Sequence, residues 1–119
     1  MFKALLFDFD GLILDTETPE VVAWQEVYAR YGVEFPVDLW GLIVGGNGAQ
    51  DFDPVAYLAE KSGQAIDADL MRLDKRVRDR ELISYQGILP GVRDYLETAR
   101  TLGLQTAIAY RVGACRRGL

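Results

Sequence analysis

The chain has 119 residues, half of them apolar and 26% charged, and this predicts one ordinary soluble globular domain. The formal net charge of −5 argues against a nucleic-acid partner, because nucleic-acid-binding proteins usually carry a basic face. The longest apolar run near the N-terminus is too short to span a bilayer, and acids interrupt it where a secretory signal would continue, so no membrane association is expected.

The numbers of cysteine and histidine residues limit the kinds of site that this chain can form. The one cysteine, Cys115, cannot form an internal disulfide, so a reducing, cytoplasmic setting is expected. Histidine is absent, which excludes a Ser-His-Asp triad and an HExxH zinc site within this chain. Acid–base chemistry must therefore use carboxylates, lysine, tyrosine or water. The composition leaves the oligomeric state open.

The first elements along the chain are a strand and a helix. Residues 3–9 are nearly continuous apolar sequence, as expected for a parallel strand covered on both faces, and the acids and glycine of Asp8-Phe9-Asp10-Gly11 end it. Thr18-Pro19 has the residues of a helix start, and Gly32 is placed to end that helix. A loose segment with a short apolar patch around Leu39 and Trp40 is expected next.

Two further helices are predicted by their caps. Asp53-Pro54 starts a helix that ends near Gly63, and Asp67 can cap the next one. That last helix has an apolar side and a basic side, and the basic side is interpreted as a solvated surface rather than a phosphate or nucleic-acid patch. The apolar side carries Ile66, Leu70, Leu73 and Val77, and the basic side carries Arg72, Lys75, Arg76, Arg78 and Arg80.

The C-terminal part returns to a sheet pattern. An amphipathic helix from Val92 to Leu102 stops at Gly103, and residues 104–109 form a second strand. The order of elements predicts an α/β fold in which residues 1–15 and 87–109 form part of a parallel-sheet core. Residues 16–86 are then an inserted helical cap. Residues 110–119 form an irregular tail, which suggests a truncated or frame-altered end or a natural flexible tail.

Asp8 and Asp10 are the candidate catalytic residues. Residues i and i+2 of a strand face the same way, so both carboxylates can point into one site at the strand's C-terminal end, where open α/β sheets bind ligands. Mg²⁺ would relieve their repulsion, one carboxylate could attack phosphorus, and the other could act as general acid and base. From Asp-x-Asp-Gly alone, the alternative of two solvated turn residues stays open.

The wider motif decides between these alternatives. The stretch Leu6-Phe7-Asp8-Phe9-Asp10-Gly11-Leu12-Ile13-Leu14-Asp15-Thr16-Glu17 closely resembles the first signature motif of the haloacid dehalogenase superfamily. It is most similar to the branch of phosphoglycolate-phosphatase-like and β-phosphoglucomutase-like enzymes that carry a helical cap, and the resemblance covers about residues 1–109.

The resemblance implies a Rossmann-like core, Mg²⁺ as cofactor and a small phosphorylated metabolite as substrate. It matches Asp8 to the nucleophile and metal ligand. It matches Asp10 to the general acid/base, with its backbone carbonyl as a metal ligand. Asp15 and Thr16 match the end of the motif and are interpreted as structural.

The insert holds a second candidate site. Gly45, Gly46, Asn47 and Gly48 lie where cap residues of similar proteins face the substrate, and their backbone N–H groups could bind an anion. The alternative is a hinge between cap helices. The aromatic residues of the insert are interpreted as its core rather than a ligand cage: Trp24, Tyr28, Tyr31 and Tyr57.

The resemblance fails in the C-terminal region. The second motif of the superfamily has a serine or threonine where this chain has Tyr110, and neither the third-motif lysine nor the fourth-motif acids are present. We therefore expect a phosphohydrolase-family protein that is weakly active or inactive as this chain. A phosphosugar mutase and a non-catalytic fragment or binding-only relative are the alternatives. A phosphoacceptor signalling domain is disfavoured, because such domains lack a long helical insert after the first strand.

Overall fold

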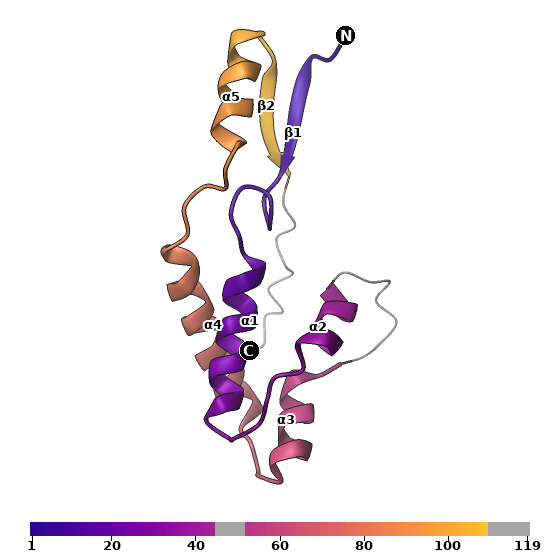
Figure 1. Cartoon of the computed structure of the whole chain (residues 1–119), viewed down its shortest axis with the longest axis vertical. Coiled ribbons are helices and arrows are strands. Elements are labelled where there is room, and N and C mark those ends of the chain that lie inside the picture. Colours follow the sequence, from indigo (N-terminus) through magenta and orange to yellow (C-terminus); the bar gives the residue numbers. More distant parts are fainter. Residues whose placement is uncertain (45–51, 110–119) are drawn as a thin grey trace. The chain divides into compact units, whose positions relative to one another are not determined.

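The structure of the chain is a computed structural model that describes residues 1–44 and 52–109. In chain order, the elements are a strand, five helices and a second strand (Figure 1). Among the described residues they divide into two compact units: residues 1–17 with 86–109, and residues 18–44 with 52–85. None of the helices in the described ranges is long and apolar enough to cross a membrane.

The first unit contains the sheet. Strands β1 (Ala4–Asp8) and β2 (Gln105–Ala109) pair in parallel, from Ala4 opposite Gln105 to Asp8 opposite Ala109. Helix α5 (Val92–Thr101) precedes β2 and begins after Gly91, whose φ of +87° favours glycine. The predicted α/β class with a parallel sheet is confirmed.

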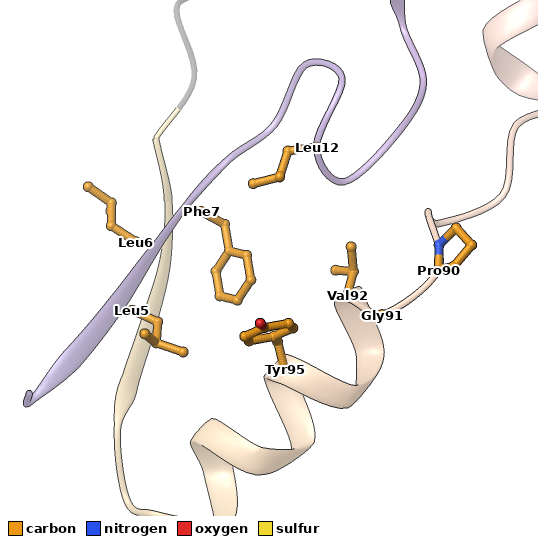
Figure 2. A pocket seen from close by; sticks show the side chains of 8 residues that line it. All are labelled: Leu5, Leu6, Phe7, Leu12, Pro90, Gly91, Val92 and Tyr95. Carbon is orange, nitrogen blue, oxygen red and sulfur yellow. The ribbon is translucent and has the colours of Figure 1, made fainter.

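One face of β1 packs toward α5. The strand alternates between exposed and half-buried residues, and Figure 2 shows Phe7 pointing toward Val92 and Tyr95 of α5, while Leu6 points away. Leu6 is 71% exposed, and every residue of β2 is exposed. The prediction that the first strand is covered on both faces is therefore wrong for the described chain, because α5 covers only one side.

The second unit is built from four helices: α1 (Glu17–Ala29), α2 (Val37–Val44), α3 (Pro54–Ser62) and α4 (Ala68–Ser84). The predicted helix ends at Gly32 and Gly63 are confirmed, since both glycines have positive φ just after a helix. The prediction of a loose segment around Leu39 and Trp40 is wrong, because these residues lie in α2.

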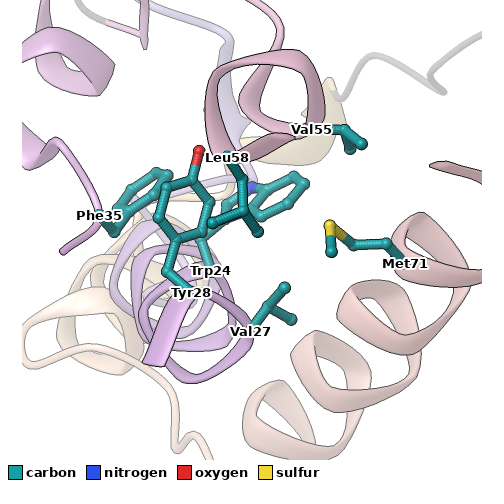
Figure 3. Close-up of a cluster of buried hydrophobic side chains, with 7 residues drawn as sticks. All are labelled: Trp24, Val27, Tyr28, Phe35, Val55, Leu58 and Met71. Carbon is teal, nitrogen blue, oxygen red and sulfur yellow. The ribbon is translucent and has the colours of Figure 1, made fainter. Parts of the chain in front are cut away.

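An aromatic core holds these helices together (Figure 3). The Phe35 ring packs edge-on against Tyr28 with centroids 5.0 Å apart, and it stacks on Trp24 at 6.1 Å. The phenol of Tyr28 donates a hydrogen bond to the Pro54 carbonyl, and burial raises the pKa of Tyr28. The interpretation of the aromatic residues as core is confirmed. The buried cluster comprises Trp24, Val27, Tyr28, Phe35, Val55, Leu58 and Met71.

Helix α4 attaches to α1 through ion pairs. Lys75 is only 7% exposed, and its Nζ lies 2.6 Å from Glu20 Oε1 and 3.6 Å from Asp79 Oδ2. Arg78 donates two hydrogen bonds to the Glu26 carboxylate. The interpretation of the basic side of α4 as a solvated surface is therefore wrong for Lys75, because α1 supplies the carboxylate that pairs with its buried ammonium.

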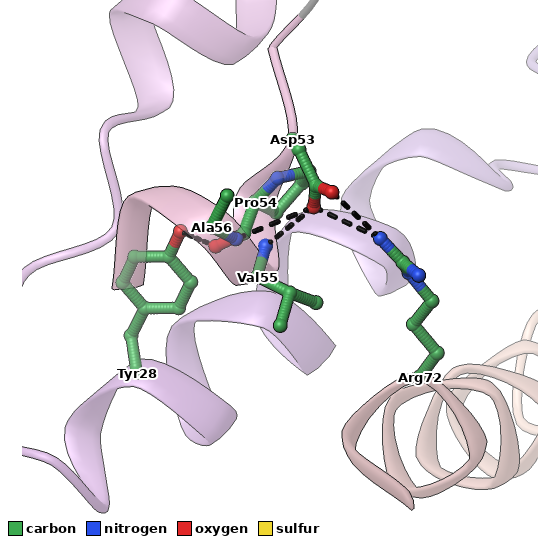
Figure 4. Close-up of polar contacts among 6 residues, drawn as sticks. All are labelled: Tyr28, Asp53, Pro54, Val55, Ala56 and Arg72. Atoms are coloured by element: carbon green, nitrogen blue, oxygen red, sulfur yellow. Dashed lines mark hydrogen bonds and ion pairs between the residues drawn. The ribbon is translucent and has the colours of Figure 1, made fainter. Parts of the chain in front are cut away.

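Asp53 connects α3 to α4. Its carboxylate accepts hydrogen bonds from the Val55 and Ala56 N–H groups and from the Arg72 guanidinium, as Figure 4 shows. Partial burial raises the pKa of Asp53, but the Val55 amide, Arg72 and the Ala56 amide outweigh it, and the net pKa lies below the ordinary 3.8. Asp53 and Asp67 are the N-caps of α3 and α4, as predicted.

We predict that Leu58→Ala destabilises the second unit by about 2–5 kcal/mol, because Leu58 is fully buried and the variant leaves a cavity. Urea unfolding followed by tryptophan fluorescence measures the loss, since Trp24 and Trp40 both belong to this unit. Leu42→Ala in α2 is the control, since Leu42 is 69% exposed and its loss should change stability by no more than about 0.5 kcal/mol. Equal effects of the two substitutions would contradict this core assignment.

The acid dependence of stability should change in Asp53→Asn. A carboxyl whose folded pKa is lowered stabilises the fold above its unfolded pKa, and this contribution is lost as pH falls from about 3.8 through the folded value. Asparagine still caps α3 but does not titrate. The variant should therefore lose less unfolding free energy than the parent between about pH 6 and about pH 3. Glu60→Gln, at an exposed α3 position, is the control, and an unchanged acid slope in Asp53→Asn would refute the expectation.

Candidate functional site

Asp8 lies where both strands end. It is the last residue of β1, opposite the last residue of β2, and its side chain is exposed. Its Oδ1 accepts a hydrogen bond of 2.8 Å from the Phe9 amide. This bond turns the carboxylate toward the backbone that follows the strand. The carboxyl ends of parallel strands are the usual ligand-binding edge of an open α/β sheet.

Asp10 lies in a closed turn after β1. The Gly11 amide donates to the Leu14 carbonyl at 2.8 Å, and Asp10 and Leu14 form an isolated bridge. The Phe9 carbonyl accepts from the amides of Leu12 and Ile13. Gly11 has a φ of +71°, which explains why glycine follows Asp10. Asp10 therefore lies in the turn, beyond the last residue of β1, and not on the regular strand.

A second contact fixes this turn from outside. The Leu89 amide, in the segment before α5, donates to the Ile13 carbonyl at 2.8 Å. The turn is therefore tied to a residue 76 positions further along the chain. The sequence analysis missed this contact, and it could not have been found there, because a backbone hydrogen bond leaves no residue signature.

Both carboxylates are available to a ligand. Asp8 and Asp10 are exposed, and neither forms an ion pair within residues 1–44 and 52–109. The same part of the chain contains no group of three or more His, Cys, Asp or Glu side chains that could hold a metal ion. Two carboxylates are hard oxygen donors of the kind Mg²⁺ prefers, so they fit part of a magnesium site.

The other predicted site residues lie either just before α1 or outside the described residues. Asp15 and Thr16 are half-buried just before α1, which suits a structural role. Helix α1 begins at Glu17, ahead of the predicted start at Thr18-Pro19. Tyr110, at the position of the second motif, lies outside the described residues. So does the whole glycine-rich turn: Gly45, Gly46, Asn47 and Gly48.

Comparison with known proteins identifies the family of this chain. Residues 2–110 match the haloacid dehalogenase-like hydrolase family. The chain is 39% identical over 109 residues to the "Putative phosphatase YhcW" of Bacillus subtilis, covering 92% of this chain and 49% of that protein. It is 29% identical over 110 residues to the "Phosphorylated carbohydrates phosphatase" of Thermotoga maritima, covering 90% of this chain and 49% of the relative.

A solved structure agrees with these relatives. A HAD family hydrolase from Deinococcus radiodurans, solved with bound phosphate and sodium, superposes with a TM-score of 0.68 at 26% identity, over 94% of this chain and 48% of that one. The chain therefore belongs to the haloacid dehalogenase-like hydrolase family, and the resemblance found in its first motif is confirmed. It spans about half the length of the curated relatives that it matches.

Gly11→Ala tests the turn that holds Asp10. A residue with a β-carbon at this positive φ should lower stability by about 1–2 kcal/mol, although the nearest atom to the added carbon, Cγ of Glu17, is 3.8 Å away. Urea unfolding followed by circular dichroism gives the difference. Gly41→Ala, inside α2 and with nothing near the added carbon, is the matched control and should be neutral or stabilising. A neutral Gly11→Ala would show that the turn does not require glycine.

Proposed function

We propose that the chain is the nucleophile-bearing part of a Mg²⁺-dependent phosphatase that acts on a small phosphate monoester. The observation that carries this proposal is the exposed Asp8 at the C-terminal end of β1, followed by Asp10 in a turn closed at Gly11. Membership of the hydrolase family supports this assignment of roles. The name of the Thermotoga maritima relative supports a phosphorylated sugar as substrate.

The two carboxylates would divide the chemistry. A carboxylate oxygen of Asp8 attacks phosphorus, and the bond from phosphorus to the leaving oxygen breaks, which gives an aspartyl phosphate. Asp10 donates its proton to the leaving oxygen and so releases the alcohol. Asp10 then takes a proton from water as that water attacks phosphorus. This second step releases inorganic phosphate and restores Asp8.

Magnesium would be held by the carboxylate of Asp8 and by Asp10 through its backbone carbonyl, the ligand that the family motif implies. When bound, the cation neutralises phosphate charge so that an anionic nucleophile can approach. Two protein oxygens leave the ion dependent on water and on donors outside the described residues. We therefore propose that the 119-residue chain binds Mg²⁺ weakly and turns over slowly by itself.

A phosphosugar mutase is the close alternative, because it would use the same aspartyl phosphate. Both relatives described above carry the word phosphatase in their names, and this favours hydrolysis. Product analysis with a hexose phosphate separates the two activities, since a mutase releases little free phosphate. A binding-only role is the remaining alternative.

The decisive experiment joins residues 1–109 of this chain to the remaining C-terminal half of the Bacillus subtilis relative. We predict Mg²⁺-dependent release of phosphate from small sugar phosphates by this chimera. Asp8→Asn should lower kcat by about a thousandfold or more, because it removes the nucleophile. Asp10→Asn should lower kcat by about 10²–10⁴-fold, because it removes the general acid and base.

Asp38→Asn is the control, since Asp38 is an exposed carboxylate in the first turn of α2 and should leave kcat unchanged. Acid-quenched trapping of phosphoprotein should succeed with the parent chimera and fail with Asp8→Asn. A chimera that keeps its rate after Asp8→Asn would disprove the nucleophile assignment. The unmodified 119-residue chain, assayed in parallel with an aryl phosphate, should show little turnover, and a rate equal to that of the chimera would refute its predicted weakness.

A further inference from the structure

Helix α4 has an apolar stripe that the described residues of its own unit leave largely exposed. Leu70, Leu73 and Val77 are 57%, 51% and 60% exposed. At about 100° per residue, the three side chains fall within about 60° of one another around the helix. Met71 and Lys75, which are the buried residues of α4, lie on the opposite side. The side of α4 that packs into its unit therefore contains Met71 and the charged Lys75, and the side with Leu70, Leu73 and Val77 is exposed.

One pair of charges beside this stripe, Asp69 and Arg76, is self-complementary. Asp69 and Arg76 lie on the same flank of the stripe, within about 20° of each other around the helix. They are seven residues apart, and Leu73 lies near their midpoint. Both residues are exposed, and neither side chain forms an ion pair within the described chain.

We propose that this stripe is the contact between two copies of the chain. A twofold axis beside Leu73 would set two α4 helices antiparallel, with Leu70 of one copy against Val77 of the other and the two Leu73 side chains at the centre. A twofold axis keeps the same flank of both helices on one side. Asp69 of each copy then meets Arg76 of the other, which forms two equivalent ion pairs.

The charge pattern selects this occupant over an unrelated partner. An antiparallel second copy needs opposite charges at equal distances on either side of the axis, and Asp69 and Arg76 provide this arrangement. Arg72 is already paired with Asp53, and Asp74 is paired with Arg30. The contact surface of one helix face is small, so the dimer is weak and depends on concentration.

Sedimentation equilibrium of the full 119-residue chain tests the proposal. A monomer–dimer equilibrium is expected, and Leu73→Glu should raise the dimer Kd by about tenfold or more, because two carboxylates would then meet at the axis. Leu42→Glu and Leu6→Glu, at exposed apolar positions of α2 and β1, should leave Kd unchanged. A chain that stays monomeric up to its solubility limit, or a dimer that Leu6→Glu and not Leu73→Glu dissociates, would overturn the proposal.

A charge exchange makes the test specific to antiparallel α4 helices. Asp69→Arg and Arg76→Asp should each weaken self-association, because each places like charges opposite one another. An equimolar mixture of the two variants should associate again, since both cross-pairs then join opposite charges. Circular dichroism confirms that each variant keeps its helices. If the mixture associates no better than the separate variants, the antiparallel register is wrong.

Discussion

The hydrogen bond from the Gly11 amide to the Leu14 carbonyl is the constraint on which the candidate site depends. This bond closes the turn that directly follows Asp10. The positive φ of Gly11 makes this bond possible without steric strain. The bond from Leu89 to Ile13 then holds the turn against the segment that enters α5. The position of Asp10 is therefore set by backbone geometry, and its carboxylate remains free for chemistry.

The second unit is stabilised by different means. Its aromatic core contributes non-directional burial, and the geometry between helices is fixed by polar contacts at their ends and edges. Asp53 shows this well, because one carboxylate both caps α3 and binds Arg72 of α4. The buried Lys75 requires Glu20 beside it, since an ammonium without a carboxylate would be costly to bury. These contacts determine how α4 is oriented on α1.

The sequence predicted those features that local chemistry controls. Asp53 and Asp67 begin helices and Gly63 ends one, because capping involves only neighbouring residues. Helix α2 was missed, since Gly41 interrupts it and the only acid at its start is Asp38. The covering of β1 was also mispredicted, because a continuous apolar run shows that a strand could be buried on both faces. It does not show which segments are present to cover it.

Helix α4 shows that the spacing of apolar residues predicts a helix but does not predict which of its sides is buried. Leu70, Leu73 and Val77 make the most regular apolar side, yet the helix buries the side that contains Lys75. Burial of that side is favourable only because α1 presents Glu20 and Glu26 to match Lys75 and Arg78, and this matching cannot be read from α4 alone. Once ion pairs have oriented the helix, its apolar side must face outward. An exposed apolar row with the complementary charges of Asp69 and Arg76 along one flank is then more consistent with a contact surface than with a misplaced core.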